Sequence, residues 1–238
     1  MAFRASRVER WALPHEPYAR TLISMSASLI YLVDNTLDGQ GASPRELQAA
    51  FKHMHERLEI VTEAYAAVSL ERVNSLRPSH IVLSGQSHPW TSYPPGSLDG
   101  VVDVIKKATQ PILGVCGGHQ QIAEAYGAAV GLMARLEPGD GYQGAKRERG
   151  FFPVETIADL NGASLFKELP QTFTVWHSHF DEVKELPEDF KRTAFNETCA
   201  IQAMQHTSRP VFGVQFHPEL FNDEHPEGRQ ILENFLQF

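Results

Sequence analysis

Cysteine is scarce in this chain: Cys116 and Cys199 are the only two among 238 residues. Two cysteines cannot build the disulfide framework of a secreted scaffold, and so few of them suit a reducing compartment, so we expect a cytoplasmic location. Long hydrophobic runs are missing as well, because no apolar stretch approaches the roughly 20 residues that a membrane-spanning helix needs. The first residues lack the apolar core of a secretory signal. We therefore expect neither a membrane segment nor a signal peptide.

An excess of positive charge is also absent. Lysine and arginine together number 21 against 29 aspartates and glutamates, which gives a formal net charge of −8. This balance argues against a general nucleic-acid-binding surface. The chain contains no G-x-x-x-x-G-K-[ST] phosphate loop and shows no pattern of a second domain that would activate an acceptor. We therefore expect no cofactor, and the length suits a single domain with its own core.

The most informative stretch that is present reads Pro-Ile-Leu-Gly-Val-Cys-Gly-Gly-His-Gln, over residues 111–120. The apolar run 112–115 predicts a strand, and a helical pattern over about 119–126 follows it. Cys116 lies between them at a glycine-rich corner. This is the layout of a nucleophile elbow with sulfur in place of a serine oxygen. The corner exposes the sulfur at a helix N-terminus, where partial positive charge favours the thiolate. Alternatively, Cys116 is a small buried hydrophobic residue.

A second segment, residues 211–220, reads Val-Phe-Gly-Val-Gln-Phe-His-Pro-Glu-Leu. It predicts a strand over 211–216, with His217 and Glu219 just beyond its end. Residues two apart in an extended chain point to the same side, and Pro218 biases His217 toward extended geometry. Glu219 can then orient the imidazole of His217, which leaves the other ring nitrogen free to act as a base. An ordinary exposed loop is the alternative, but each segment supports the chemical interpretation of the other.

Apolar runs alternate with helical patterns along the chain, which predicts an α/β domain with a mostly parallel central sheet and helices on both faces. Further strands are expected at 29–33, 80–84, 173–176 and 199–204. The segment Ser43-Pro44-Arg45-Glu46 resembles a capping box, and apolar residues spaced by three and four as far as Val68 predict a helix of about two dozen residues. Residues 67–76 fit a helix end or a strand, and 137–150 predict a loop or irregular hairpin.

Four blocks of this sequence together resemble the class I glutamine amidotransferases. They are 114–120 and 213–219, the Trp176-to-Val183 block with its S-H-x-D-x-V pattern, and the partial Ile81-to-Gly85 block. The resemblance runs from about Leu29 to the C-terminus and looks closest to stand-alone domains similar to the amidotransferase domain of GMP synthase. It implies a flavodoxin-like, single-domain fold over residues 29–238, preceded by an N-terminal extension over 1–28.

The resemblance also implies roles for individual residues. Cys116, His217 and Glu219 would form the catalytic triad that attacks the γ-carboxamide of glutamine or of a similar γ-glutamyl compound. The oxyanion donors would come from Gly117 and from the turn at Gly85-Gln86. The substrate's amino-acid end would contact the side chain of Gln120 and the backbone of Ser178 and His179. Two positions depart from the usual pattern: Gln86 stands where a second glycine is common, and Gly117 where a bulky residue is common.

Three functions fit these observations. The first is a glutaminase subunit that hydrolyses glutamine and passes ammonia to a separate synthase or ligase partner. The second is a self-sufficient γ-glutamyl hydrolase or peptidase that uses the same triad. The third is a catalytically impaired binding or regulatory module, which Gln86 would favour. His53-x-His55 and His177-x-His179 are not expected to bind a metal, since residues two apart on a helix do not share a face and the second pair lies inside a family-like block.

Overall fold

The computed structural model describes residues 28–157 and 164–238, so most of the expected N-terminal extension lies outside the described residues. In these ranges one large sheet contains β1 (Leu29–Asp34), β2 (Glu59–Ala64), β3 (His80–Leu83), β4 (Ile112–Val115), β6 (Glu148–Thr156), β7 (Thr172–His179), β9 (Phe190–Phe195), β10 (Ala203–His206) and β11 (Val211–Val214). A small second sheet pairs β5 (Val130–Leu132) with β8 (Asp181–Val183). The helices are α1 (Ser43–Met54), α2 (Leu70–Leu76), α3 (Asp99–Lys107), α4 (Gly117–Ala125) and α5 (Glu227–Phe235).

The strand order of the large sheet is β2-β1-β3-β4-β11-β10-β9-β6-β7. The first five strands in this order run parallel to one another. The remaining four form an antiparallel extension beside β11. The structure confirms the expected α/β domain, and its parallel half is the part that carries the elbow. None of the helices in the described ranges combines the length and hydrophobicity needed to cross a lipid bilayer.

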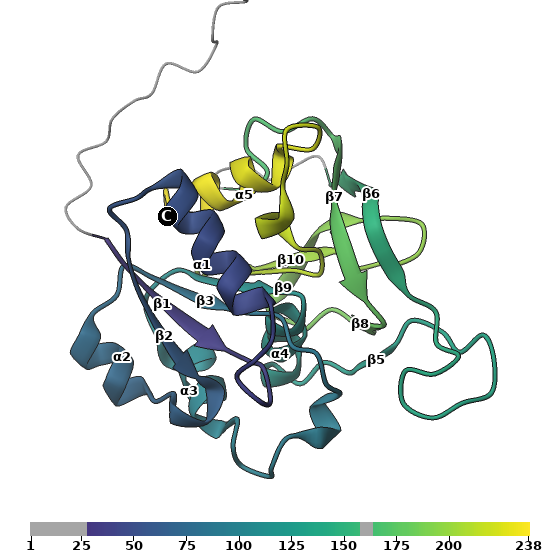
Figure 1. The fold of residues 1–238 in the computed structure, drawn as a ribbon, viewed down its shortest axis with the longest axis horizontal. Coiled ribbons are helices and arrows are strands. Elements are labelled where there is room, and N and C mark those ends of the chain that lie inside the picture. Colours follow the sequence, from purple (N-terminus) through teal and green to yellow (C-terminus); the bar gives the residue numbers. More distant parts are fainter. Residues whose placement is uncertain (1–27, 158–163) are drawn as a thin grey trace, which may run out of the picture.

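Helices cover both faces of the sheet, with α1 and α5 on one side and α3 and α4 on the other (Figure 1). The inner parallel strands β1, β3, β4 and β11 are buried on both faces, as their continuous apolar sequences predict. Along β1, Ile30 and Leu32 pack in the cluster under α1 and α5. Their neighbours Tyr31 and Val33 pack in the cluster under α3 and α4. This alternation follows the two-residue period of a strand.

The expected helix of two dozen residues is wrong, because α1 ends at Met54 and the chain continues as strand β2. This strand pairs in parallel with β1 and forms one edge of the sheet. Ile60 and Val61 pack against opposite apolar clusters, as successive residues of a strand do, so Val61 continued the helical spacing only by coincidence. The run of β-branched residues 60–62 is the signal that favours a strand here.

Other boundaries also differ from the expectations. The ambiguous segment 67–76 contains helix α2, whose N-terminal N–H from Arg72 is capped by the Ser69 hydroxyl. Residues 199–202 precede β10 rather than belonging to it. The expected loop at 137–150 gives way to β6 at Glu148. Ser43 begins α1 without acting as its cap, since the cap position is Ala42 and carries no side-chain hydrogen bond.

Helix α4 lies very close to the strands that precede it, because two glycines leave room for the backbone. A Cβ atom on Gly118 would lie 2.3 Å from the carbonyl oxygen of Leu83 in β3. A Cβ atom on Gly114 would lie 2.4 Å from the carbonyl oxygen of Gly118. Both contacts are with backbone, so a larger residue could be accommodated only by moving the helix. The glycines around residue 116 therefore fix the position of α4 relative to the sheet.

Candidate active site

Cys116 lies at the corner between β4 and α4, in a backbone conformation that side chains rarely adopt. Its φ is +51° and its ψ is −103°. The Gln120 N–H donates to the Cys116 carbonyl, so the helix begins directly behind the cysteine. The side chain is only 6 % exposed. A strained residue at a strand-to-helix corner is the defining feature of a nucleophile elbow.

His217 reaches the same edge of the sheet from the neighbouring strand. Strands β4 and β11 are parallel, with Val115 opposite Val214, so the residues that follow both strands emerge together. The His217 N–H donates to the carbonyl of Trp176 in β7 at 2.7 Å. Its ring lies against Gly85: a Cβ atom added to Gly85 would be 3.3 Å from the ring atom Cε1 of His217. The backbone of β7 thus holds His217 beside the turn that follows β3.

Glu219 contacts His217 through a backbone geometry different from the expected one. The Nδ1 atom of His217 lies 2.8 Å from Oε1 of Glu219, and both side chains are buried. Residues Pro218–Leu220 form a 3₁₀ turn, so the extended chain expected here is wrong. The turn still returns the carboxylate to the ring, and the fixed φ of Pro218 suits the first position of the turn. The imidazole–carboxylate contact therefore joins residues two apart in the chain through a turn.

The surroundings of His217 favour its charged form. Burial alone would lower the pKa of the imidazole, but the Glu219 carboxylate and the Cys116 sulfur outweigh burial. The pKa of His217 is therefore raised well above its ordinary value of 6.5. An imidazolium between a carboxylate and a sulfur atom can donate a proton and stabilise a thiolate.

Ser43 joins Glu219 to the turn after β3, a role that sequence reasoning missed. Its hydroxyl accepts a hydrogen bond from the Gly85 N–H at 2.9 Å and donates to Oε1 of Glu219 at 3.4 Å. The local sequence around Ser43 indicated only a helix cap. Its contacts with Gly85 and Glu219 join segments far apart in the chain, so they leave no signal in the local sequence. The Gly85 N–H is consequently occupied and is not free to bind an oxyanion.

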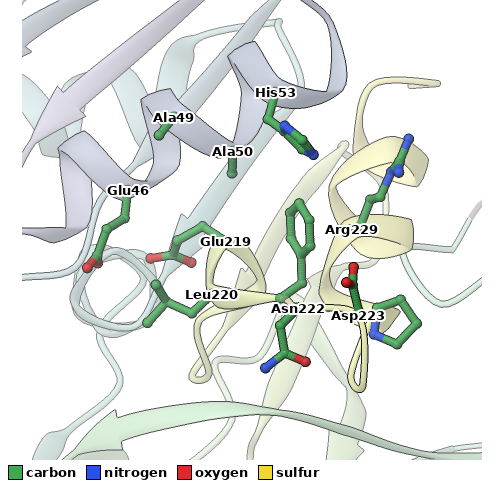
Figure 2. A pocket seen from close by; sticks show the side chains of 11 residues that line it. Glu46, Ala49, Ala50, His53, Glu219, Leu220, Asn222, Asp223 and Arg229 are labelled. Carbon is green, nitrogen blue, oxygen red and sulfur yellow. The ribbon is translucent and has the colours of Figure 1, made fainter.

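A pocket of about 570 Å³ opens behind Glu219, between α1 and α5 (Figure 2). Glu46 and Glu219 both line it, from α1 and from the 3₁₀ turn. Burial raises the pKa of Glu46, and the negative charge of Glu219 adds to that effect. The Oε2 atom of Glu219 accepts no hydrogen bond from the described residues. His217 does not line this pocket.

The sulfur of Cys116 has polar neighbours from two strands. The amide Nε2 of Gln215 lies 3.7 Å from the sulfur, and the Ser178 carbonyl oxygen lies 3.9 Å from it. The Gln120 side chain donates to Gln215 Oε1 at 3.2 Å and to the Asp181 carbonyl at 3.1 Å. Gln215 was missed in the sequence, although its position two residues before His217, just after β11, could have indicated it.

The sequence comparisons agree with this geometry. Residues 41–238 match the family model described as glutamine amidotransferase class-I. The chain is 39 % identical over 168 residues to a glutamine-hydrolysing GMP synthase subunit of Pyrococcus abyssi, covering 71 % of this chain and 79 % of the relative. It is 30 % identical over 204 residues to the protein of the same name in Methanobrevibacter smithii, covering 84 % and 93 %. The chain belongs to the class I glutamine amidotransferase family.

Solved structures show the same fold. A crystal structure of a protein described as a GMP synthase subunit, from Thermoplasma acidophilum, has a TM-score of 0.71 at 28 % identity, covering 90 % of this chain and 94 % of that one. A glutamine amidotransferase from Thermotoga maritima has a TM-score of 0.65 at 18 % identity, covering 90 % and 100 %. The second likeness concerns the fold alone. The family and its relatives identify this amidotransferase as a glutamine-hydrolysing enzyme.

In this amidotransferase the turn after β3 carries Gln86 where a second glycine is usual, and the backbone of the turn is not strained by this residue. Gln86 does not adopt a positive φ, so a residue with a side chain is accommodated at this position without backbone strain. No hydrogen bond from the Gln86 N–H or the Gly117 N–H is seen within the described ranges. These two groups, rather than the occupied Gly85 N–H, are the expected oxyanion donors that remain available.

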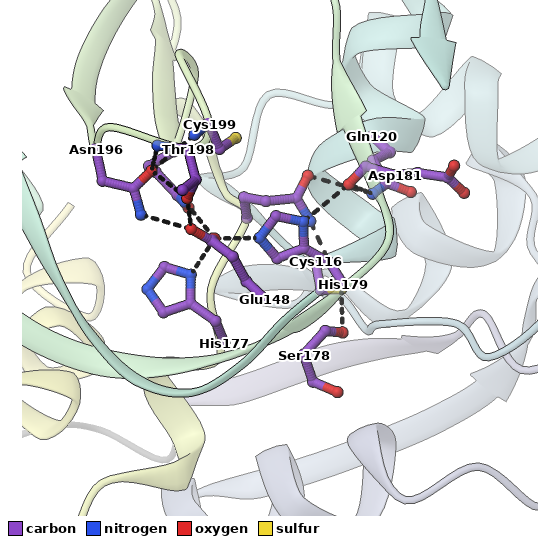
Figure 3. A network of polar contacts seen from close by, with 12 residues as sticks. Cys116, Gln120, Glu148, His177, Ser178, His179, Asp181, Asn196, Thr198 and Cys199 are labelled. Carbon is purple, nitrogen blue, oxygen red and sulfur yellow. Dashed lines mark hydrogen bonds and ion pairs between the residues drawn. The ribbon is translucent and has the colours of Figure 1, made fainter. Parts of the chain in front are cut away.

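The His179 ring lies in a buried polar network, between the Glu148 carboxylate and the Asp181 backbone (Figure 3). Its Nδ1 lies 2.9 Å from the Asp181 carbonyl oxygen, and its Nε2 lies 2.7 Å from Oε2 of Glu148. Both partners are acceptors, so both ring nitrogens donate and the ring is positively charged. The pair holds the 178–181 corner, whose Ser178 carbonyl faces Cys116.

Glu148 is saturated by donors from several strands and loops. Gln202 donates to its Oε2 at 2.8 Å and Asn196 to its Oε1 at 2.9 Å, while the Thr198 hydroxyl also donates to Oε1. The Nδ1 of His177 lies 3.0 Å from Oε2. Metal-ligand atoms of Glu148, His177 and His179 thus lie within 4.8 Å of one another. These contacts of the carboxylate make the cluster a hydrogen-bonded network. The sequence analysis did not predict that Glu148 belongs to it.

Replacing Glu148 with glutamine removes the counter-charge of a buried imidazolium. Burial alone would raise the pKa of Glu148, but hydrogen bonds from the two histidines and Thr198 hold it well below its ordinary value of 4.5. We expect Glu148→Gln to lower the free energy of unfolding at pH 7 by about 3–5 kcal/mol. Because the folded-state pKa is depressed, this difference is present above about pH 4.5 and shrinks as the pH falls below it.

Urea unfolding at several pH values measures this effect. Glu155→Gln is the matched control, because Glu155 lies on the same strand and is exposed. If Glu148→Gln lowers the free energy of unfolding no more than the control does, or by an amount that does not depend on pH, the assigned charge pair is contradicted.

Proposed function

We propose that this amidotransferase hydrolyses the γ-carboxamide of glutamine through a thioester on Cys116 and delivers the ammonia to a separate synthase subunit. One observation carries the proposal: the parallel pairing of β4 and β11 brings Cys116, His217 and Glu219 to one edge of the sheet. The printed names of the relatives, which describe glutamine-hydrolysing subunits, support the same substrate. We further propose a domain spanning 29–238, an extension over 1–28, and a cytoplasmic location, which the two free cysteines favour.

In the first half of the reaction, the Cys116 thiolate attacks the γ-carbon of glutamine. A carbon–sulfur bond forms, and the carbonyl π electrons move to the oxygen. The N–H groups of Gln86 and Gly117 donate hydrogen bonds to that oxyanion, and the loss of one such donor typically costs about 3–4 kcal/mol. His217, held charged by Glu219, gives its proton to the amide nitrogen as the carbon–nitrogen bond breaks. Ammonia leaves, and a γ-glutamyl thioester remains.

In the second half, neutral His217 takes a proton from water as the water oxygen attacks the thioester carbon. The carbon–sulfur bond breaks, glutamate is released, and the thiolate and imidazolium are restored. Glu219 keeps the proton on Nδ1, so that Nε2 performs both transfers. The side chain of Gln120 and the Ser178-His179 backbone contact the amino-acid end of the substrate.

The ammonia requires an acceptor outside the described fold. The GMP synthase relatives are named as individual glutamine-hydrolysing subunits, and this chain covers 79 % of one of them. We therefore assign to this chain the glutaminase part of a two-subunit synthase. A self-sufficient γ-glutamyl hydrolase and a catalytically impaired binding module are not favoured by these relatives. The unstrained Gln86 backbone also removes the main reason for the impaired module.

Replacing Cys116 with alanine should abolish ammonia release from glutamine, because no other described thiol lies at the elbow. Ammonia is measured with purified chain, alone and with its synthase subunit. Cys199→Ala is the matched control and should retain activity, since Cys199 is buried away from the elbow and burial raises the pKa of its thiol. Preferred turnover of a γ-glutamyl dipeptide over glutamine would favour the self-sufficient hydrolase. Undiminished ammonia release by Cys116→Ala would contradict the proposal.

Replacing Glu219 with glutamine should move the alkaline limb of the pH profile of kcat to lower pH. The substitution removes the negative charge that stabilises the His217 imidazolium, so the pKa of His217 falls and its donated proton is lost at a lower pH. We expect kcat at pH 7.5 to fall by at least about 100-fold. Exposed Glu224 lies in the segment that follows, and Glu224→Gln should leave the profile in place. An unshifted profile in Glu219→Gln would remove Glu219 from the proposed triad.

A further inference from the structure

The two departures from the usual amidotransferase pattern, Gln86 and Gly117, are in direct contact. A Cβ atom on Gly117 would lie 2.5 Å from Cγ of Gln86 and 2.8 Å from its backbone nitrogen. No larger residue therefore fits at 117 while Gln86 keeps its position. Gln86 fills the space that a side chain after the nucleophile would enter, so the two positions form one steric unit.

The carboxamide of Gln86 has a defined orientation. Tyr142 donates its hydroxyl proton to Oδ2 of Asp181 at 2.7 Å, and the Gln86 side chain lies close enough to the same hydroxyl to lower its pKa. Because the hydroxyl proton is already committed to Asp181, the group of Gln86 that suits this oxygen is the donor Nε2. The Tyr142 ring is itself fixed by stacking on Phe180, with ring centroids 4.6 Å apart. We infer that the amide turns its nitrogen toward Tyr142.

The oxygen of that amide is left without a donor. Oε1 of Gln86 is buried and accepts no hydrogen bond from the described residues. A buried acceptor without a donor is unfavourable by itself, so such an atom at an active site calls for a ligand. Its side chain packs on Gly117, the residue directly after Cys116, which places Gln86 at the reacting end of the substrate rather than at its amino-acid end.

The reacting end of glutamine offers one kind of donor. Its γ-carboxamide carries a carbonyl oxygen, which accepts, and an amino group with two N–H donors. We propose that Oε1 of Gln86 accepts a hydrogen bond from the N–H of the scissile carboxamide, so that Gln86 selects amide over ester substrates. This inference rests on the proposed glutamine hydrolysis and adds a specificity-determining contact to it. A site built to bond an N–H discriminates against an analogue that lacks it.

The test compares glutamine with L-glutamate γ-methyl ester, which has no N–H at the reacting end. Gln86→Met keeps an unbranched side chain against Gly117 and removes the amide oxygen. We expect the ratio of kcat/KM for glutamine to kcat/KM for the ester to fall by about 10- to 100-fold. Glutamate release measures both reactions. A ratio within about twofold of that of the wild type would overturn the inference.

Gln110→Met is the matched control. The Oε1 atom of Gln110 is likewise buried without a donor, but Gln110 precedes β4 and lies at the opposite end of that strand from Cys116. The control should keep the wild-type ratio. An equal fall of the ratio in both variants would also overturn the inference.

A second set of variants tests the steric unit without relying on Gln86→Met alone. Gly117→Leu should lower the midpoint of thermal unfolding, because the new side chain meets Gln86. Adding Gln86→Gly should restore part of the lost midpoint, because it removes the Cγ contact at 2.5 Å but leaves the backbone nitrogen at 2.8 Å, and it should return glutamine turnover with a reduced amide-to-ester ratio. Additive losses in the double variant would contradict the coupling. A wild-type chain that releases no ammonia with its synthase subunit present would instead contradict the proposed function itself.

Discussion

The parallel pairing of β4 with β11 is the constraint on which the rest of the site depends. Cys116 and His217 are about a hundred residues apart in the chain, and only the register of these two strands brings them to one edge. The carboxyl edge of a parallel sheet is the usual location of such sites, because the strands end there together and the loops that follow are free to vary. The close approach of α4, which requires glycines at 114 and 118, then fixes the direction of the elbow.

Two buried carboxylates organise the surroundings of this edge. Glu219 raises the pKa of His217 and contacts the turn after β3 through Ser43. Glu148 neutralises His179 and thereby holds the corner whose Ser178 carbonyl faces the sulfur. Glu219 contacts the catalytic His217 directly, whereas Glu148 acts through His179 and the Ser178 carbonyl. The antiparallel strands β6 and β7 therefore do more than widen the sheet, since they supply one of these charges and the backbone acceptor of the His217 N–H.

The fold class could be predicted because parallel strands that are buried on both faces leave continuous apolar runs, as at 112–115 and 211–214. The elbow and the His217–Glu219 pair were also visible, since short motifs record local geometry. The end of α1 was not, because Leu58 and Val61 continued the helical spacing by coincidence while the β-branched run 60–62 favoured a strand. Ser43, Glu148 and Tyr142 could not be found from the local sequence, because their roles depend on contacts with segments far along the chain. The contact between Gln86 and Gly117 belongs to the same class: each departure was visible, but their compensation appears only in three dimensions.

The central claim is that the reaction passes through a covalent bond to one sulfur atom. Mass spectrometry of the chain, quenched in acid during turnover of glutamine, tests it most directly. We expect a γ-glutamyl group on the peptide that contains Cys116 and none on the peptide that contains Cys199. Sustained ammonia release without any adduct on Cys116, or with the adduct on Cys199, would contradict it.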